Sequence, residues 1–451
     1  MFSAVKGCWA LFLGLGIMML GNGLQSTLLG VRAELEGFAN FATGIVMSGY
    51  YVGFLAGSVI IPKMVNRVGH IRSFGAMAAL ASTSILLHPV FVDPWVWGTM
   101  RIITGFSYAG LYIICESWIN DASTNENRGQ MLSVYMLVIL GAMCISQLLL
   151  NVADPGGFEL FTLISILVSV AVVPILVSVS PAPAFDAPEN VSVRTLYSVS
   201  PLGVIGLFFA MMGQAMVFNL GAVYASELGL KISQISLLML MQYVGGILLQ
   251  WPVGQLSDRM DRRFVIMIIC FLSAAAGGLL SLLVAADWKL FVMFLIFGGL
   301  IQPVYSLCLA HTNDYLNPQQ MVAASGTMVL IGGVGALIGP LIASAAMELI
   351  GTTALMLTSS ICFGLIGVFA IWRMTRRASL PLAEQSDYVV MAPVPNAAAI
   401  NPGVEWEDWD PAAAEQPDPV EELFEEFTSP DEDVDEPDEG EPVEAGAEEK
   451  G

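Results

Sequence analysis

The chain alternates long apolar runs with short polar breaks over most of its length. Each run is bounded by charged residues, proline or glycine, and each approaches the roughly 20 residues that a helix needs to cross a bilayer. The pattern predicts an all-α integral membrane protein with twelve transmembrane helices. The predicted spans lie near residues 8–29, 41–62, 73–92, 95–117, 130–152, 158–180, 201–225, 232–253, 264–285, 289–310, 321–347 and 352–373.

Two breaks divide this pattern into parts. Residues 181–200 carry several prolines and charges and predict a cytoplasmic linker between an N-terminal six-helix half, 1–180, and a C-terminal six-helix half, 201–377. From 378 to 451 the chain is rich in Pro, Ala, Asp and Glu and has too few apolar residues to form a core. We therefore expect a disordered acidic cytoplasmic tail.

Composition supports the membrane assignment, and the strongly negative net charge comes from one end of the chain. The 451 residues are 56% hydrophobic and 12% charged, which is unlike either a soluble globular chain or a disordered one. The net charge of -22 comes from residues 384–451, which hold 23 acids and one base, whereas residues 1–383 hold 16 of each. The body is neutral, and we expect no nucleic-acid partner.

The distribution of Lys and Arg predicts the orientation, because these residues are retained on the cytoplasmic side. With the N-terminus inside, only Arg32, Lys231 and Lys289 face outward. Twelve bases then face the cytoplasm: Lys6, Lys63, Arg67, Arg72, Arg128, Arg194, Arg259, Arg262, Arg263, Arg373, Arg376 and Arg377. We expect a multi-pass protein of the plasma membrane, the inner membrane in a bacterium, with both termini cytoplasmic.

The two halves repeat one another. The charged turn Gly254–Arg263 has a weaker copy 192 residues earlier, at Asn66–His70 with Arg72 following. The same offset aligns Tyr51 and Gly53 with Tyr243 and Gly245, and an offset of 193 aligns Gly105, Tyr112 and Asp121 with Gly298, Tyr305 and Asp314. Helices one to six are therefore expected to match helices seven to twelve in order.

The turn has the spacing G-x-L-x-D-R-x-x-R-R, which resembles the signature loop of the major facilitator superfamily between the second and third helices of each half. Asp261 stands where that pattern usually has Gly, and the first copy has Pro62 for the opening Gly and Asn66 for the Asp. The resemblance implies two parallel six-helix repeats. It also implies secondary active transport of a small solute by alternating access, which we expect to be proton-coupled. The run Glu116–Trp118 is similar to a poorly characterised, YcaD-like branch of bacterial transporters.

The resemblance implies that helices one, four, seven and ten line a central cavity. On helix four, Tyr108 and Tyr112 lie within about 20° of Arg101, and a buried charge there should face the cavity or a partner. Arg101 and Gly105 also resemble an Arg-x-x-x-Gly element linked with proton coupling; alternatively, Arg101 pins backbone carbonyls. The expected substrate-binding residues are Asn22, Gln25, Arg101, Tyr108, Tyr112, Gln214, Gln302 and Tyr305.

A second set is expected to act in gating or coupling. Glu116 lies 15 residues beyond Arg101, about 22 Å along a helix, so the two cannot pair directly. We expect Glu116 to meet Arg67 or Arg72 when the cytoplasmic side closes. The full set is Arg67, Arg72, Glu116, Asp258, Arg259 and Arg262.

No motif for catalysis, ATP binding or a cofactor is visible, and the three histidines do not cluster, so we expect neither an enzyme nor a metal site. The six cysteines fall inside apolar runs, which argues against disulfides. We expect a monomer whose partners are the solute, protons and the lipid bilayer. The alternative is a transport-inactive receptor or scaffold that signals through its tail, with Trp406 and Trp409 as docking points for a protein partner. The solute and the direction of transport stay open.

Overall fold

The computed structural model describes residues 8–121, 123, 128–177, 191–283 and 287–376, together with 381, 385 and 388. Every regular element in these ranges is a helix, and twelve of the helices have 18 residues or more. The first six are α2 (Trp9–Leu35), α3 (Asn40–Val68), α4 (His70–Leu87), α5 (Pro94–Asp121), α6 (Arg128–Leu149) and α7 (Glu159–Val177). The last six are α9 (Pro201–Glu227), α10 (Ile232–Arg259), α11 (Arg262–Leu280), α12 (Trp288–Asn313), α13 (Pro318–Ile350) and α14 (Ala354–Met374).

The predicted fold class is confirmed. Eleven helices of the described ranges are long and apolar enough to cross a membrane, and the twelfth, α4, has 18 residues and packs between α5 and α7. An 18-residue helix is about 27 Å long, close to the thickness of the hydrocarbon core. The predicted tail lies outside the described residues except at the three isolated positions, and Trp406 and Trp409 are not among these.

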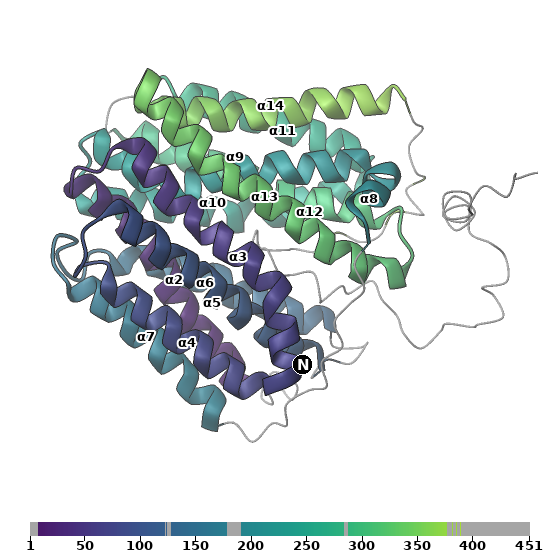
Figure 1. The fold of residues 1–451 in the computed structure, drawn as a ribbon. Coiled ribbons are helices and arrows are strands. Elements are labelled where there is room, and N and C mark those ends of the chain that lie inside the picture. The colour runs from purple at the N-terminus through teal and green to yellow at the C-terminus, as the bar shows by residue number, and fades with distance from the viewer. Residues whose placement is uncertain are drawn as a thin grey trace, which may run out of the picture. The chain divides into compact units, whose positions relative to one another are not determined.

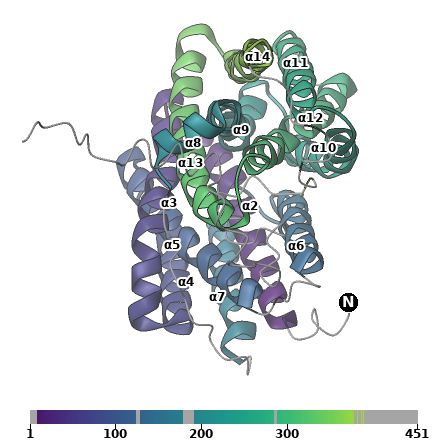
Figure 2. The same cartoon turned by 90° about the vertical axis from the view of Figure 1, so that its right-hand side faces the viewer.

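The two sets of six helices use the same packing scheme (Figures 1 and 2). In the first set α2 packs on α6 and α7, α3 on α5, and α4 on α5 and α7. In the second set α9 packs on α13 and α14, α10 on α12, and α11 on α12 and α14. Each pair in the first set has its counterpart six spans later, as the internal repeat predicts.

Glycines at repeated positions bring two helix pairs into backbone contact. A Cβ added to Gly105 on α5 would lie 1.8 Å from the carbonyl oxygen of Tyr50 on α3, and one on Gly53 would lie 1.8 Å from that of Ile102. In the second half, a Cβ on Gly245 of α10 would lie 1.9 Å from the carbonyl oxygen of Leu295 on α12. Small residues of this kind let membrane helices approach closely.

The linker contains a short helix that the composition did not predict. Helix α8 (Val193–Val199) follows Ser192, whose hydroxyl accepts a hydrogen bond of 3.1 Å from the backbone N–H of Thr195. This N-cap satisfies an amide that the first turn would otherwise leave unpaired. Helix α8 packs on α9 and α13. Residues 181–190 of the predicted linker lie outside the described ranges.

The halves are joined at the predicted outer ends of their helices. The amide of Asn40, at the start of α3, donates a hydrogen bond of 2.7 Å to Glu227 at the end of α9. Asn151, just after α6, donates one of 2.8 Å to the Ser236 hydroxyl near the start of α10. Helix pairs α3 and α13, α2 and α9, and α6 and α10 form this interface. The two halves are therefore in contact at this end of their helices in this conformation, and that this end faces outward stays a prediction.

Candidate functional site

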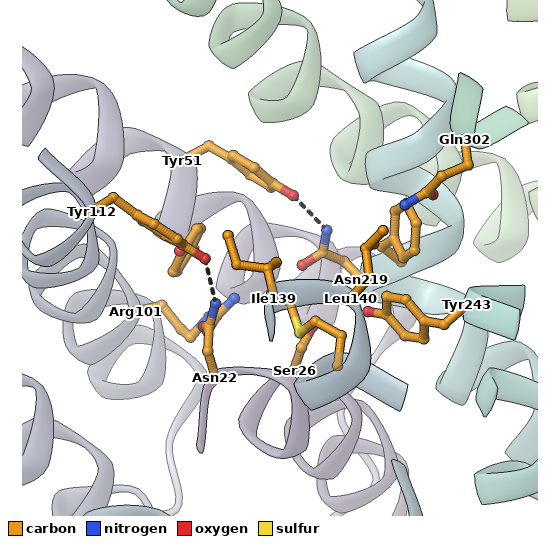
Figure 3. A pocket seen from close by; sticks show the side chains of 13 residues that line it. Asn22, Ser26, Tyr51, Arg101, Tyr112, Ile139, Leu140, Asn219, Tyr243 and Gln302 are labelled. Atoms are coloured by element: carbon orange, nitrogen blue, oxygen red, sulfur yellow. Dashed lines mark hydrogen bonds between the residues drawn. The ribbon is translucent and has the colours of Figure 1, made fainter. Parts of the chain in front are cut away.

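A cavity lies between the two halves (Figure 3). Helices α2, α3, α5 and α6 line it from the first half, and α9, α10 and α12 line it from the second. Its empty volume is about 720 Å³ including the opening to solvent. The lining combines amides, tyrosines, apolar side chains and a single charge: Asn22, Ser26, Tyr50, Tyr51, Arg101, Tyr112, Ile139, Leu140, Met143, Phe218, Asn219, Tyr243 and Gln302. Both halves contribute, so a bound solute would contact both of them.

Arg101 is the only charged residue among the described residues that line this cavity. It is 2% exposed, and its guanidinium carbon lies 4.7 Å from the centre of the Tyr50 ring. Its Nε and Nη1 atoms have no hydrogen-bond partner among the described residues. The aromatic face offsets part of the cost of burying the charge, by roughly 2 kcal/mol in a desolvated setting.

Amides fix two of the tyrosines at the cavity wall. Asn22 Nδ2 donates to the Tyr112 hydroxyl at 3.5 Å within the first half (Figure 3). Asn219 Nδ2 donates to the Tyr51 hydroxyl at 3.0 Å and so joins α9 to α3 across the interface. The second bond holds together the two halves at the level of the cavity. It would have to break if the halves separated on this side.

The eight residues expected to bind substrate divide equally between lining and packing positions. Asn22, Arg101, Tyr112 and Gln302 line the cavity. The other four are buried but lie outside its lining: Gln25, Tyr108, Gln214 and Tyr305.

Two of these packing residues have partners that explain their position. Gln214 Nε2 donates to the Ile301 carbonyl oxygen at 2.6 Å and ties α9 to α12, as amides commonly do between membrane helices. The Tyr108 hydroxyl is directed to the carbonyl oxygen of Met18 at 3.4 Å, against α2. Whether any of the eight residues binds a solute stays a prediction.

The sequence pattern did not indicate Tyr50, Tyr51, Asn219 and Tyr243 as lining residues. A signal was present for two of them, because Tyr51 and Tyr243 are a repeat pair at the offset of 192 residues. They stand on α3 and α10, helices that the four-helix expectation left out. The two members of this repeat pair therefore line the cavity from opposite halves.

The expected gating residues differ in burial and in partners. Arg67, Arg72 and Arg259 are exposed, and within the described ranges none of them forms an ion pair. Arg262 is buried and pairs with Asp314 at the end of α12, while Ser257 accepts from its Nε at 2.9 Å. Its contact with Asp258 is longer, at 3.8 Å. Their role in gating stays a prediction.

Glu116 is buried within α5. It is 2% exposed and accepts a hydrogen bond of 2.8 Å from the Tyr135 hydroxyl on α6. In this conformation its partner is therefore a tyrosine rather than Arg67 or Arg72, which are exposed. The pairing with Arg67 or Arg72, expected for a conformation closed on the cytoplasmic side, stays a prediction.

Asp261 stands in the turn where the family pattern usually has Gly, and its side chain makes contacts that Gly could not make. Its carboxylate accepts from the backbone N–H of Arg263 at 3.0 Å, which caps α11, and pairs with Arg263 Nη2 at 2.8 Å. Partial burial raises the pKa of Asp261, but the hydrogen bonds and charge of Arg263 outweigh it, so the pKa lies below its usual value. This aspartate stabilises the start of α11 rather than facing the cavity.

A protein-family model matches most of the chain in sequence. The model described as Major Facilitator Superfamily matches residues 11–200 and 203–422. The chain belongs to the major facilitator superfamily. It is therefore a membrane transporter by family and not an enzyme, and the expected resemblance is confirmed.

Relatives of this superfamily member include transporters that are described as uncharacterized. The chain is 23% identical, over 82% of its length and 96% of the relative's, to the uncharacterized MFS-type transporter YcaD of Escherichia fergusonii. The solved structure of the nucleoside transporter NupG matches with a TM-score of 0.64, 14% identity and coverage of 82% of this chain and 98% of that one. A bacterial homologue of the lysosomal transporter Spinster, in an inward-facing and occupied conformation, matches with a TM-score of 0.66 and 11% identity over 84% and 97%. These likenesses establish the fold.

Proposed function

We propose that this superfamily member moves a small solute across the bacterial inner membrane by alternating access and couples the movement to protons. The observation that carries the proposal is the cavity built from both halves, with Arg101 on one wall and Gln302 on the other. The hydrogen bonds at the outer ends support an inward-facing reading of this conformation. Transport then requires that these bonds break while the opposite side closes.

A cross-link at the outer ends tests this proposal without knowledge of the solute. Asn40→Cys with Glu227→Cys replaces a pair joined by a 2.7 Å hydrogen bond, and Ser26→Cys adds a reporter thiol at the cavity. We expect a membrane-impermeant maleimide added outside intact cells to label the reporter when the pair is reduced, as measured by mass spectrometry on the peptide that carries the Ser26→Cys substitution, because the reduced pair itself also reacts. Oxidation of the pair should block this labelling, and reduction should restore it.

Matched variants make the result specific. The reporter with Asn40→Cys alone should be labelled equally with and without oxidant. The parent chain gives the background from its own thiols, of which Cys8 and Cys144 are half-buried and the other four buried. A reporter that reacts only after the cells are permeabilised, even with the pair reduced, would reject alternating access and favour the receptor alternative.

Glu116 is the residue to which we assign proton coupling. It is a buried carboxyl on α5, and among the described residues the titratable groups found to act on it or to be affected by it are Tyr112, Cys115, Tyr135 and Tyr305, none of which is basic. Burial of a carboxylate without a cationic partner is costly even with the hydrogen bond from Tyr135, so a neutral Glu116 suits this conformation better than a charged one. A change of conformation that exposes Glu116 would let it release the proton.

This assignment predicts a pH-dependent conformational equilibrium. Spin labels at Phe41→Cys and Leu349→Cys, two exposed positions at the outer ends of different halves, report the separation of the halves. Lowering the pH should increase the population with a short distance, because protonation favours the conformation that buries Glu116. Glu116→Gln should hold that population constant across the titration, whereas the exposed control Glu159→Gln should titrate like the parent. A persistent pH response in Glu116→Gln would assign coupling to another group.

A further inference from the structure

The two walls of the cavity carry polar atoms that the protein itself leaves unpartnered. On the α5 side, Nε and Nη1 of Arg101 are buried without a hydrogen-bond partner among the described residues, and on the α12 side Oε1 of Gln302 is in the same state. Figure 3 shows the two side chains at opposite sides of the lining. Buried polar groups in native proteins are nearly always satisfied, so each of these atoms points to a missing partner.

The charge of the missing partner follows from the lining. Among the described lining residues no acid balances Arg101, and its nearest aromatic neighbour, Tyr50, is neutral when protonated. A guanidinium presents parallel N–H donors that match the two oxygens of a carboxylate. With a single cation in the lining, one negative charge is balanced and a second would be left unpaired in a desolvated site.

The shape of the partner follows from the space between these two ends. Tyr50, Tyr51, Tyr112, Phe218 and Tyr243 offer ring faces or edges to the cavity. The side chains Ile139, Leu140 and Met143 of α6 add an apolar wall. Flat apolar groups pack well against such rings, in offset or edge-to-face arrangements. The middle of the ligand is therefore apolar and flat, with its polar groups at the two ends.

We infer that the cavity binds a small organic monoanion with a flat apolar body, held at its anionic end by Arg101 and at its other end, through a hydroxyl or amino donor, by Gln302. This inference rests on the proposed function, because it takes the cavity as the solute site. It narrows the solute to one charge class and one shape.

The probe para-hydroxybenzoate carries all three features and can be compared with matched compounds. Its neutral counterpart para-hydroxybenzamide lacks the charge, benzoate lacks the hydroxyl donor, and a short aliphatic hydroxy acid lacks the flat body. Binding to the purified full-length chain in detergent is measured by titration calorimetry. We expect para-hydroxybenzoate to bind at least roughly ten-fold more tightly than the amide, the amount that a charge-assisted hydrogen bond contributes.

Variants connect this preference to the two residues. Arg101→Gln should weaken binding of para-hydroxybenzoate by roughly ten- to a hundred-fold and remove the preference over the amide. Arg101→Lys should restore part of it, since it keeps the charge but loses the planar fork. Gln302→Met, similar in size, should bring para-hydroxybenzoate down to the affinity of benzoate. The exposed Lys63→Gln in the same half, at a residue outside both expected sets, is the control and should leave all affinities unchanged.

Specific results would overturn the inference. These are equal binding of the amide and the acid by the parent, unchanged affinity in a folded Arg101→Gln chain, tighter binding of the aliphatic acid, or no binding of any of the acids. Calorimetry reports equilibrium binding alone. A chain that binds the acid but fails the labelling test would keep the anion site and lose the transport proposal. A chain that passes the labelling test but binds no acid would keep the transport proposal and lose the anion site.

Discussion

Replacing Gly105 by alanine is expected to prevent the first half from folding in its observed form. The added Cβ would lie 1.8 Å from the Tyr50 carbonyl oxygen, and the neighbouring atoms are backbone that cannot rotate away. Helices α3 and α5 would have to separate by more than an ångström along a contact that Gly53 also makes. Overpacking usually costs about 1–3 kcal/mol, and a clash with rigid backbone should exceed that range.

Thermal unfolding of the purified chain in detergent measures this effect, and the same helix provides the control. A Cβ on Gly98 of α5 would meet nothing within 4 Å, so Gly98→Ala should be neutral or stabilising by up to about 1 kcal/mol from helix propensity. Gly298→Ala in the second half should reproduce the loss, because its Cβ would lie 2.4 Å from the Gln242 carbonyl oxygen. A Gly105→Ala chain that melts with the parent would contradict the backbone contact.

The contact between α3 and α5 marks the limit of what the sequence could predict about the site. Twelve apolar runs are enough to predict twelve helices, because a spanning helix needs little beyond length and hydrophobicity. The amino-acid repeat by itself also places Gly105 and Gly298 at equivalent positions. It does not reveal that the glycines bring α3 against α5, with Arg101 over the ring of Tyr50. Tyr50 and Tyr51 were missed for this reason.

Helix periodicity placed Arg101, Tyr108 and Tyr112 on one stripe, yet only Arg101 and Tyr112 line the cavity. The stripe is about 40° wide, and α2 covers part of it, so that Tyr108 is directed at Met18. A single helix pattern indicates the buried face but cannot indicate which neighbour covers it. Gln214 illustrates the same limit, since its amide binds the backbone of α12 instead of the cavity.

Contacts between the halves could not be predicted at all from the pattern. The bond from Asn219 to Tyr51 and the bond from Asn40 to Glu227 join residues far apart in sequence. An alternating-access cycle would break them in its other conformation, so they depend on the state as well as on the sequence. The partner of Glu116 also depends on the conformation. The hydrogen bond from Tyr135 in this conformation therefore does not test the pairing with Arg67 or Arg72 that is expected in the other one.

The signature turn of the second half contains an ion pair whose disruption is expected to be costly. The side chains of Arg262 and Asp314 are each 1% exposed, and they join the start of α11 to the end of α12. Removing one member of a buried pair costs about 3–5 kcal/mol, and Asp258, 3.8 Å from Arg262, is too distant to replace Asp314 in full. We expect Asp314→Asn and Arg262→Met each to lower the thermal unfolding midpoint strongly.

Replacing both members together separates the cost of an orphaned charge from the value of the pair. Arg262→Met combined with Asp314→Leu removes both charges, and much of the lost stability should return, because a buried ion pair contributes little relative to apolar groups of similar size. The pair Arg32 and Glu36 is the control: its members are 12% and 28% exposed, and Glu36→Gln should cost less than about 1 kcal/mol. If the double variant is as unstable as the worse single one, the charges themselves are needed to position the turn. If instead both single variants melt with the parent, the pair is loose enough to exchange partners, as the gating hypothesis for Arg262 requires.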